Sequence, residues 1–315
     1  MNDGPNPEYP HEDVEHKIGK TTIHISTYYS VAELGARALA RATRPNWQDD
    51  DQAKRYKDRG KDPAKSKLWD NSLNHTDSWA GGKSIQEMSD MATGDGWSEL
   101  LTETLSIAEN AVSMAEMMHE TQSFEPTFDV AGQDVDVDRY LSGEPENMID
   151  YPVAITSKYG KVVTLVSAGC VSSAIEPEDY IRRGQVLAAL AIALERLGHS
   201  TELWLDIGYS NYENREYHSR ILVKGSADAV DPAVIMLAYA HPGMLRKLGF
   251  GDCDQLEWSR QWVGRGMPAD ACRIDMPEEA IYTPSLTSGY ARRDTHTELR
   301  NYLKLLGLLQ GEDDD

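Results

Sequence analysis

KVVTLVS at residues 161–167 is followed by a long amphipathic stretch at Glu178–Leu197 and by TELWLDIG at residues 201–208. The first segment is almost continuously apolar, which is typical of a strand in a sheet covered on both faces. The second segment carries apolar residues at helical spacing and ends at Gly198, a residue suited to a helix C-cap. This succession predicts two neighbouring strands joined by a crossover helix.

The segments downstream extend this unit. YHSRILVK at residues 217–224 predicts a third strand, and the short polar link Tyr209–Glu216 predicts a hairpin between it and the second strand. Asp231 followed by Pro232 is the N-cap and N1 arrangement of a helix, which we expect to reach Tyr239. The C-terminal half therefore predicts an α/β fold whose sheet layer has the order β-α-β-β-α. Two more elements are expected further along, a strand at residues 271–276 and a helix at residues 295–309.

The N-terminal half is predicted to be mainly helical after one strand at residues 20–29, where β-branched and aromatic residues gather. Ser84 and Glu87 have the spacing of a capping box, which predicts a helix that begins at Ile85. Residues 97–119 carry an apolar stripe at three-and-four spacing and predict a longer, buried helix. A further helix is expected at residues 31–42.

Changes in composition divide the chain into five parts. We expect a flexible arm at residues 1–20, a mainly helical region at 21–120, an acidic connector at 121–150, an α/β domain at 151–310 and an acidic tail at 311–315. Within the helical region, basic side chains gather at residues 48–67, where Gly60 and Pro63 interrupt any helix. The sequence therefore predicts a basic surface loop there.

The chain as a whole is strongly acidic. Its 315 residues include 52 acidic and 31 basic side chains, which gives a formal net charge of −21. A field of this sign repels nucleic acid and anionic membranes unless a local patch inverts it. The basic loop Lys54–Lys67 is such a patch, and it is interpreted either as an anion or nucleic-acid contact or as a solvated loop. We therefore expect a protein partner or self-association, with nucleic acid bound only through this loop and no membrane.

The cysteines and the N-terminus bear on the compartment. Cys170, Cys253 and Cys272 are odd in number and far apart, which excludes a disulfide framework or a Cys-x-x-Cys metal site. A reducing compartment is the natural interpretation. The N-terminus lacks the apolar stretch of a signal peptide, and no apolar run is long enough to span a bilayer. We expect a protein that stays in the cytoplasm.

A candidate ligand site follows the first buried strand of the C-terminal half, in the loop SAGCVSSAIEPED. Ligands of α/β folds bind at the carboxyl ends of strands. Cys170 is a candidate nucleophile at the start of a helix, or alternatively a buried thiol. The candidate ligand-binding residues are Ser167, Gly169, Cys170, Ser172 and Ser173, with Asp206 contributed by the next strand.

The β-α-β-β-α order resembles the von Willebrand factor A-like (VWA-like) fold, a Rossmann-like arrangement, over residues 155–276. The resemblance implies a Mg²⁺ site in this loop, held by an Asp-x-Ser-x-Ser run. Ser167 stands where that run has Asp, and the serine spacing differs. A hard cation binds poorly to a loop without a carboxylate. The metal, the cofactor and any catalytic residue therefore remain unassigned.

Two further motifs each have a functional and a structural interpretation. DSWAGGKS at residues 77–84 nearly fits a phosphate-binding loop, but Asp77 takes the place of the first glycine and no buried strand precedes it. A turn before a capped helix is favoured. Asp134, Asp136 and Asp138 alternate, so on a strand they would share one face and could hold a divalent ion. A solvated acidic connector is favoured.

Several segments together resemble an uncharacterised domain-of-unknown-function family encoded in bacteriophage and related mobile-element genomes. They are Trp79-Ala-Gly, Gly96-Trp97, DVDRYLSGEPENM at residues 136–148, and RRGQVLAALAIALERLGHSTELW from residue 182 onwards. The resemblance covers about residues 70–250 and implies a phage origin and expression in the host bacterial cytoplasm. It supplies no activity and no catalytic residues.

The leading hypothesis is a phage-encoded accessory protein without catalytic activity, because a well-formed sheet domain occurs without a complete catalytic constellation. Its α/β domain would be a protein-interaction platform that works as an oligomer. One alternative is a metal- or nucleotide-dependent enzyme with its site at Ser167–Ser173. Another is a virion structural component whose N-terminal arm and basic loop contact neighbouring subunits.

Overall fold

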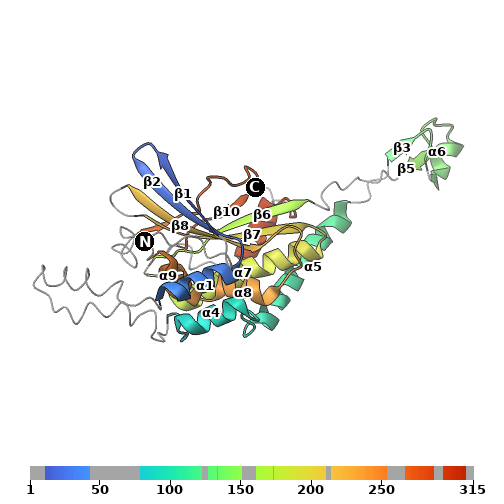
Figure 1. The fold of residues 1–315 in the computed structure, drawn as a ribbon. Helices are drawn as coiled ribbons and strands as arrows, with labels where there is room; N and C mark the ends of the chain where they lie inside the picture. The colour runs from blue at the N-terminus through green and yellow to red at the C-terminus, as the bar shows by residue number, and fades with distance from the viewer. Residues whose placement is uncertain are drawn as a thin grey trace, which may run out of the picture.

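The protein combines one large mixed sheet with a layer of helices (Figure 1). The structure is a computed structural model. It describes residues 11–42, 79–122, 127–132, 134–150, 161–172, 174–210, 214–253, 267–286 and 294–309. The fold is therefore of the mixed α/β class.

The large sheet joins both halves of the chain. Within the described residues it has seven strands, in the order β1-β2-β8-β7-β6-β10 with β9 paired to β7. β2 is parallel to β8, and β6 is parallel to β7 and β10, whereas β1–β2 and β7–β8 are antiparallel hairpins. The strands are β1 (His11–Ile18), β2 (Thr21–Tyr28), β6 (Val162–Ala168), β7 (Ser200–Ser210), β8 (Arg215–Lys224), β9 (Met267–Ala269) and β10 (Ile281–Thr283).

The helices gather on one face of this sheet (Figure 1). α7 is central in the layer, since α5, α8 and α11 all pack against it. On the opposite face, Cys272 and Ile274 pack on Ile23 and Ile25 of β2. The helices of the layer are α1 (Val31–Ala42), α4 (Ile85–Thr93), α5 (Leu101–Gln122), α7 (Pro177–Arg196), α8 (Pro232–Ala240), the π-helix η2 (Met244–Gly249), α9 (Phe250–Cys253) and α11 (Thr295–Leu305).

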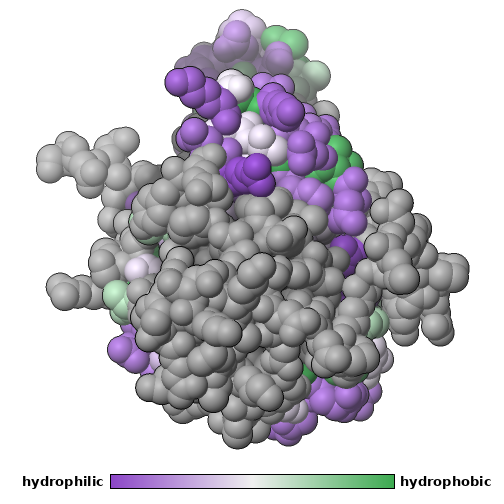
Figure 2. Space-filling model, turned by 60° about the vertical axis from the view of Figure 1, so that its left-hand side comes forward, coloured by the Kyte–Doolittle hydropathy of each residue, from purple (hydrophilic) through white to green (hydrophobic). Residues whose placement is uncertain are grey.

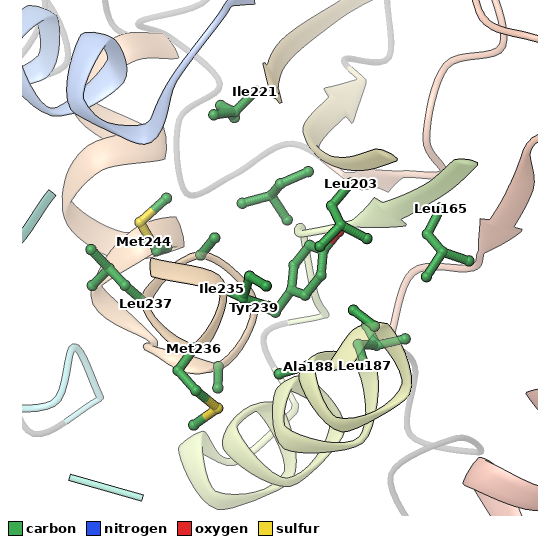
Figure 3. Packing of buried hydrophobic residues seen from close by; sticks show 14 of the residues in the cluster. Leu165, Leu187, Ala188, Leu203, Ile221, Ile235, Met236, Leu237, Tyr239 and Met244 are labelled. Carbon is green, nitrogen blue, oxygen red and sulfur yellow. The ribbon is translucent and has the colours of Figure 1, made fainter. Parts of the chain in front are cut away.

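The main core lies between α7, α8 and the strands. Figure 3 shows the apolar side chains of both helices gathered beside Leu203 of β7 and Leu165 of β6. Gly184 lets the two helices touch, because a Cβ at this position would lie 2.3 Å from the Cα of Ala240. The first turns of α7 lie under the carboxyl end of β6, where the candidate ligand loop begins.

Most of the predicted helices and strands are present, with ends that differ by a few residues. α1 has the predicted bounds, and the segments of β2, β6, α7, β7, β8 and α8 match those read from the sequence. The capping box is formed: Ser84 N donates to Glu87 Oε2 (2.8 Å), and Glu87 N donates to Ser84 Oγ (3.3 Å). Residues 79–84 are thus a turn and cap before α4, as favoured over a phosphate-binding loop.

Two expectations are wrong. The strand expected at residues 271–276 is absent, because this segment is irregular and the short strands β9 and β10 lie on either side of it. The flexible arm expected at residues 1–20 includes β1, which pairs with β2 over its whole length. Charged residues fill β1, so its strand character comes from this pairing and not from an apolar pattern.

Residues 127–150 form a smaller unit, here called the α6 unit. Its strands β3 (Thr127–Asp129), β4 (Asp134–Val135) and β5 (Met148–Asp150) pair in the order β3-β5-β4, and α6 (Val137–Leu141) lies between β4 and β5 in the chain. Asp134 lies in β4, Asp138 lies in α6, and Asp136 caps α6 by accepting from Arg139 N (3.0 Å). The three aspartates therefore do not line one face of a strand.

Candidate functional site

A small cavity lies under the carboxyl end of β6. Ser167 and Gly169 line it from the strand, and Tyr180 and Arg183 line it from the first turns of α7. It has room for about one water molecule. Within the described residues, the buried Tyr180 hydroxyl and Arg183 Nε have no hydrogen-bond partner. The cavity is therefore polar enough to hold a single water or a ligand of that size.

The candidate loop residues around this cavity form hydrogen bonds and close contacts with neighbouring segments. Ser167 Oγ accepts a hydrogen bond from Thr283 Oγ1 (3.0 Å), and Ser172 N donates to Leu286 O (3.3 Å). Gly169 N donates to Asp206 O (2.8 Å), and a Cβ here would lie 2.8 Å from Leu205 Cδ1. Ser173 lies outside the described residues. Ligand binding by this loop stays a prediction, and among its described residues Ser167 and Gly169 line the cavity.

Cys170 is buried beside the cavity. Burial raises the pKa of its thiol to about 12. A thiol with this pKa is protonated at neutral pH, and the thiolate is the nucleophilic form. The structure therefore favours the buried-thiol interpretation over an activated nucleophile.

The Asp206 carboxylate does not join the candidate loop. Because side chains alternate along β7, Leu205 and Ile207 face the helices and Asp206 faces the other side of the sheet. There, Asp206 Oδ1 lies 2.7 Å from His218 Nδ1, and Asp206 Oδ2 accepts from Cys272 N (3.0 Å). Asp206 reaches the loop only through its backbone oxygen.

His218 forms a buried ion pair with Asp206. Gly208 lies opposite His218 on β7 and leaves room for the ring, since a Cβ there would lie 2.5 Å from ring atoms. Burial lowers the pKa of His218, but the Asp206 carboxylate outweighs this effect, and the pKa is raised to about 10. Arg220 also donates to Cys272 O (3.1 Å). This Asp206 cluster (Asp206, His218, Arg220 and Cys272) therefore holds the Cys272 segment against the sheet.

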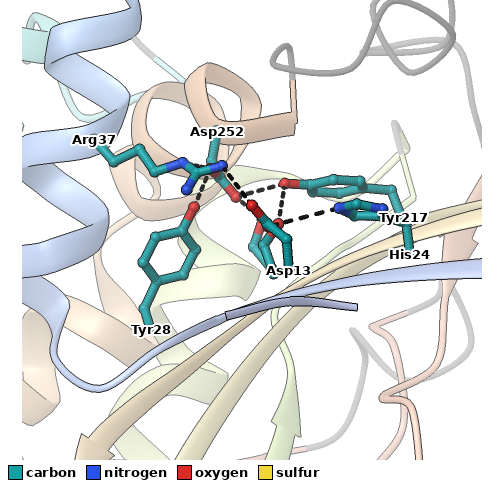
Figure 4. A network of polar contacts seen from close by, with 8 residues as sticks. Asp13, His24, Tyr28, Arg37, Tyr217 and Asp252 are labelled. Carbon is teal, nitrogen blue, oxygen red and sulfur yellow. Dashed lines mark hydrogen bonds and ion pairs between the residues drawn. The ribbon is translucent and has the colours of Figure 1, made fainter. Parts of the chain in front are cut away.

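A second polar cluster, which no motif in the sequence indicates, lies on the helix face of β2 and β8 (Figure 4). At its centre is Asp252 of α9, which is fully buried. The Asp252 carboxylate accepts hydrogen bonds from the hydroxyls of Tyr28, Tyr217 (3.0 Å) and Ser219 (2.5 Å). Burial is the main reason that the pKa values of Tyr28 and Tyr217 are raised, so both hydroxyls remain protonated donors.

Arg37 of α1 connects this centre to the edge strand β1. Its Nε lies 3.6 Å from Asp252 Oδ1, and its Nη2 lies 3.3 Å from Asp13 Oδ2. Asp13 Oδ1 also accepts from Ser26 Oγ (2.5 Å), whose oxygen lies 2.9 Å from Tyr217 Oη. The Asp252 cluster (Asp13, Ser26, Tyr28, Arg37, Tyr217, Ser219 and Asp252) therefore ties β1, β2, β8, α1 and α9 together.

The α6 unit exposes apolar side chains instead of burying them. Val137, Tyr140 and Leu141 are 61%, 63% and 76% exposed. Their spacing of three and four residues places them on one side of α6, a surface here called the α6 face. No residue of α6 is buried. Phe128, Val130 and Val135 of the same unit are also exposed.

A family match covers nearly the whole of this structure. The family described as Domain of unknown function (DUF7192) matches residues 17–310. The chain belongs to this family. No curated protein and no solved structure matches the chain. In this DUF7192 chain the matched range includes the cavity, the Asp206 cluster, the α6 unit and all of the Asp252 cluster except Asp13.

The remaining predictions for the DUF7192 chain concern metals, membranes and the basic loop. Among the described residues, no group of three or more His, Cys, Asp or Glu side chains is arranged to hold a metal ion. None of the helices that the structure describes is long and apolar enough to cross a membrane. The basic loop Lys54–Lys67 lies outside the described residues. Figure 2 shows hydrophilic side chains over much of the described surface on one face, with hydrophobic groups between them.

Proposed function

We propose that this DUF7192 protein is a non-catalytic accessory protein whose α6 unit is the docking surface of a protein-interaction platform. The observation that carries the proposal is the exposure of Val137, Tyr140 and Leu141 on one side of α6. Apolar side chains gathered on a surface are typical of interaction sites. The strands of the α6 unit have only two or three residues, which is too few to build a core that would bury these side chains.

The geometry of the large sheet supports a platform over an enzyme at Ser167–Ser173. The cavity there has room for about one water molecule, which is far less than a nucleotide needs. The Cys170 thiol is protonated at neutral pH. Asp206, which the metal-dependent alternative would require as a ligand, is bonded to His218 and Cys272 on the opposite face.

We also propose a VWA-like arrangement for the C-terminal half. The succession β6, α7, β7, β8 and α8, with β6 parallel to β7 and β8 antiparallel to β7, supports it. A phage origin and action in the host bacterial cytoplasm are proposed on the resemblance of the sequence segments alone. The same resemblance leaves a virion component as the alternative setting for the α6 unit.

Site-specific photo-crosslinking tests the platform. A photo-reactive residue replaces Leu141 in the full chain and, as a matched control, Leu305 of α11, which is 66% exposed. In the cells that naturally produce the protein, we expect one discrete protein adduct from position 141 that an excess of unmodified chain competes away. No adduct at position 141, or the same adducts at both positions, would contradict the proposal.

A further inference from the structure

The α6 unit, which carries the exposed apolar side chains, is strongly acidic. Residues 128–149 contain six carboxylates and one arginine. Five of the carboxylates are exposed, and they belong to Asp129, Asp134, Asp138, Glu144 and Glu146. A partner that covers the α6 face therefore docks on a unit of negative charge, and these five exposed carboxylates are here called the acidic rim.

The single arginine of this unit does not neutralise the negative charge that the acidic rim presents to a partner. Arg139 lies 3.4 Å from Glu144 Oε2 and donates to Glu146 O (3.4 Å). Its guanidinium also lies over the Phe128 ring, 3.8 Å from the centroid. Since Arg139 is engaged within the unit, the charge presented to a partner is negative.

This charge argues against two other occupants of the α6 face. A second copy of the chain would bring an equal acidic rim against the first, and each chain carries a net charge of −21. Like charges that meet in an interface are unfavourable and select against that pairing. An anionic membrane surface is repelled for the same reason.

We propose that the α6 face binds a polypeptide segment of a different protein in which apolar side chains are flanked by Lys or Arg. This inference rests on the proposed function, because it names the partner class of the same surface. Burial of Tyr140 and Leu141 supplies most of the affinity, since Tyr is enriched among the buried anchors that dominate interface energies and burial of the leucine side chain adds an apolar contribution. The acidic rim supplies partner choice and association rate.

Three fluorescent peptides test this partner class against the full chain. The first carries a leucine face flanked by lysines, the second replaces every lysine with glutamate, and the third keeps the lysines and replaces every leucine with serine. By fluorescence anisotropy, we expect the first to bind at least about tenfold more tightly than either of the others, which corresponds to about 1.4 kcal/mol. The affinity of the lysine–leucine peptide should fall about threefold as the salt concentration rises from about 50 to about 200 mM.

Variants locate the binding. Leu141→Asp should weaken binding of the lysine–leucine peptide by at least about tenfold, whereas Leu305→Asp, at another exposed apolar residue, in α11, should leave the affinity unchanged. Asp134→Asn combined with Asp138→Asn should weaken binding less and reduce its salt dependence. Equal binding of the lysine and glutamate peptides, or unchanged binding by Leu141→Asp, would overturn the inference.

The two proposals fail in different ways. If position 141 crosslinks to a different protein while the lysine–leucine and glutamate–leucine peptides bind equally, the partner class is wrong and the platform proposal stands. If the adduct is a second copy of the chain, the partner class is again wrong. If position 141 gives no adduct, the platform itself is wrong.

Discussion

The Asp252 cluster and the α6 unit use side chains in opposite ways. In the cluster, the polar side chains of Tyr28, Tyr217 and Asp252 are fully buried and bonded to one another. In the α6 unit, apolar side chains that a core would normally take are exposed. Burying a polar group costs free energy unless it is hydrogen-bonded. The hydrogen bonds of the cluster therefore stabilise the fold. The α6 unit leaves Val137, Tyr140 and Leu141 exposed to solvent.

Asp252→Ala should have the largest effect on this comparison. It removes a carboxylate that accepts hydrogen bonds from three buried hydroxyls and that lies beside Arg37, so we expect a loss of about 3–5 kcal/mol in the free energy of unfolding. Urea unfolding followed by circular dichroism measures it. Asp95→Ala, at an exposed aspartate, is the control and should change stability by less than about 0.5 kcal/mol. Similar midpoints for the two variants would show that the cluster does not hold the fold.

His218 tests whether the cluster on the other face of β8 also holds the fold. Its folded pKa of about 10 lies above the unfolded value of about 6.5, so the folded state binds the proton more tightly. The stabilisation is fully present below about pH 6.5 and is lost as the pH rises through about 10. His218→Gln should cost about 3 kcal/mol at pH 6 and flatten the fall in stability between pH 6 and 10. An unchanged pH slope in His218→Gln, measured by urea unfolding at several pH values, would refute the ion pair.

Asp13→Ala probes the exposed end of the Asp252 cluster and should have a smaller effect. Asp13 is 38% exposed at its side chain, and its loss removes contacts to Ser26 and Arg37. We expect about 1 kcal/mol of destabilisation and faster hydrogen exchange confined to β1 and β2. Lys17→Ala, at an exposed residue of the same strand, should leave exchange unchanged. Equal exchange in the two variants would separate β1 from the cluster.

Leu141→Asp should have the smallest effect on stability, below about 0.5 kcal/mol, because the side chain is already exposed. Leu303→Asp is the contrast, since Leu303 of α11 is fully buried and an unpaired buried charge should cost more than about 3 kcal/mol. Thermal unfolding compares the two. A large loss from Leu141→Asp would show that the α6 face is part of the fold and not a docking surface.

The elements with local signals were predictable. Ser84 and Glu87 formed the expected capping box, and Asp231 accepted the backbone hydrogen bonds expected of an N-cap. The apolar periodicity of α7 and the continuous apolar run of β6 also gave their positions. These signals lie within one turn or one strand, so no distant part of the chain is needed to interpret them. The strand expected at residues 271–276 had only weak local support, and tertiary contacts to Asp206 and Arg220 hold this segment without a strand.

The candidate site was only partly accessible from the sequence. The carboxyl end of β6 was located, and Ser167 and Gly169 line the cavity found there. The prediction that the Asp206 side chain joins this loop is wrong, because the alternation of Leu203, Leu205 and Ile207 along β7 turns Asp206 to the opposite face of the sheet. The Asp252 cluster gave no signal, since Tyr28 and Asp252 meet across 224 positions of the chain.

The sequence by itself determined the class of the fold, the main C-terminal elements and the acidic character of the α6 unit, because these follow from local periodicity, caps and charge. Tertiary structure alone decided that β1 joins the sheet, that Asp206 and Asp252 lie on opposite faces, and that Val137, Tyr140 and Leu141 are exposed. The physical reason is that burial and pairing depend on which distant segments pack together. A side chain's neighbours in space, and not its neighbours in sequence, determine whether it is buried and hydrogen-bonded within the fold or exposed to solvent.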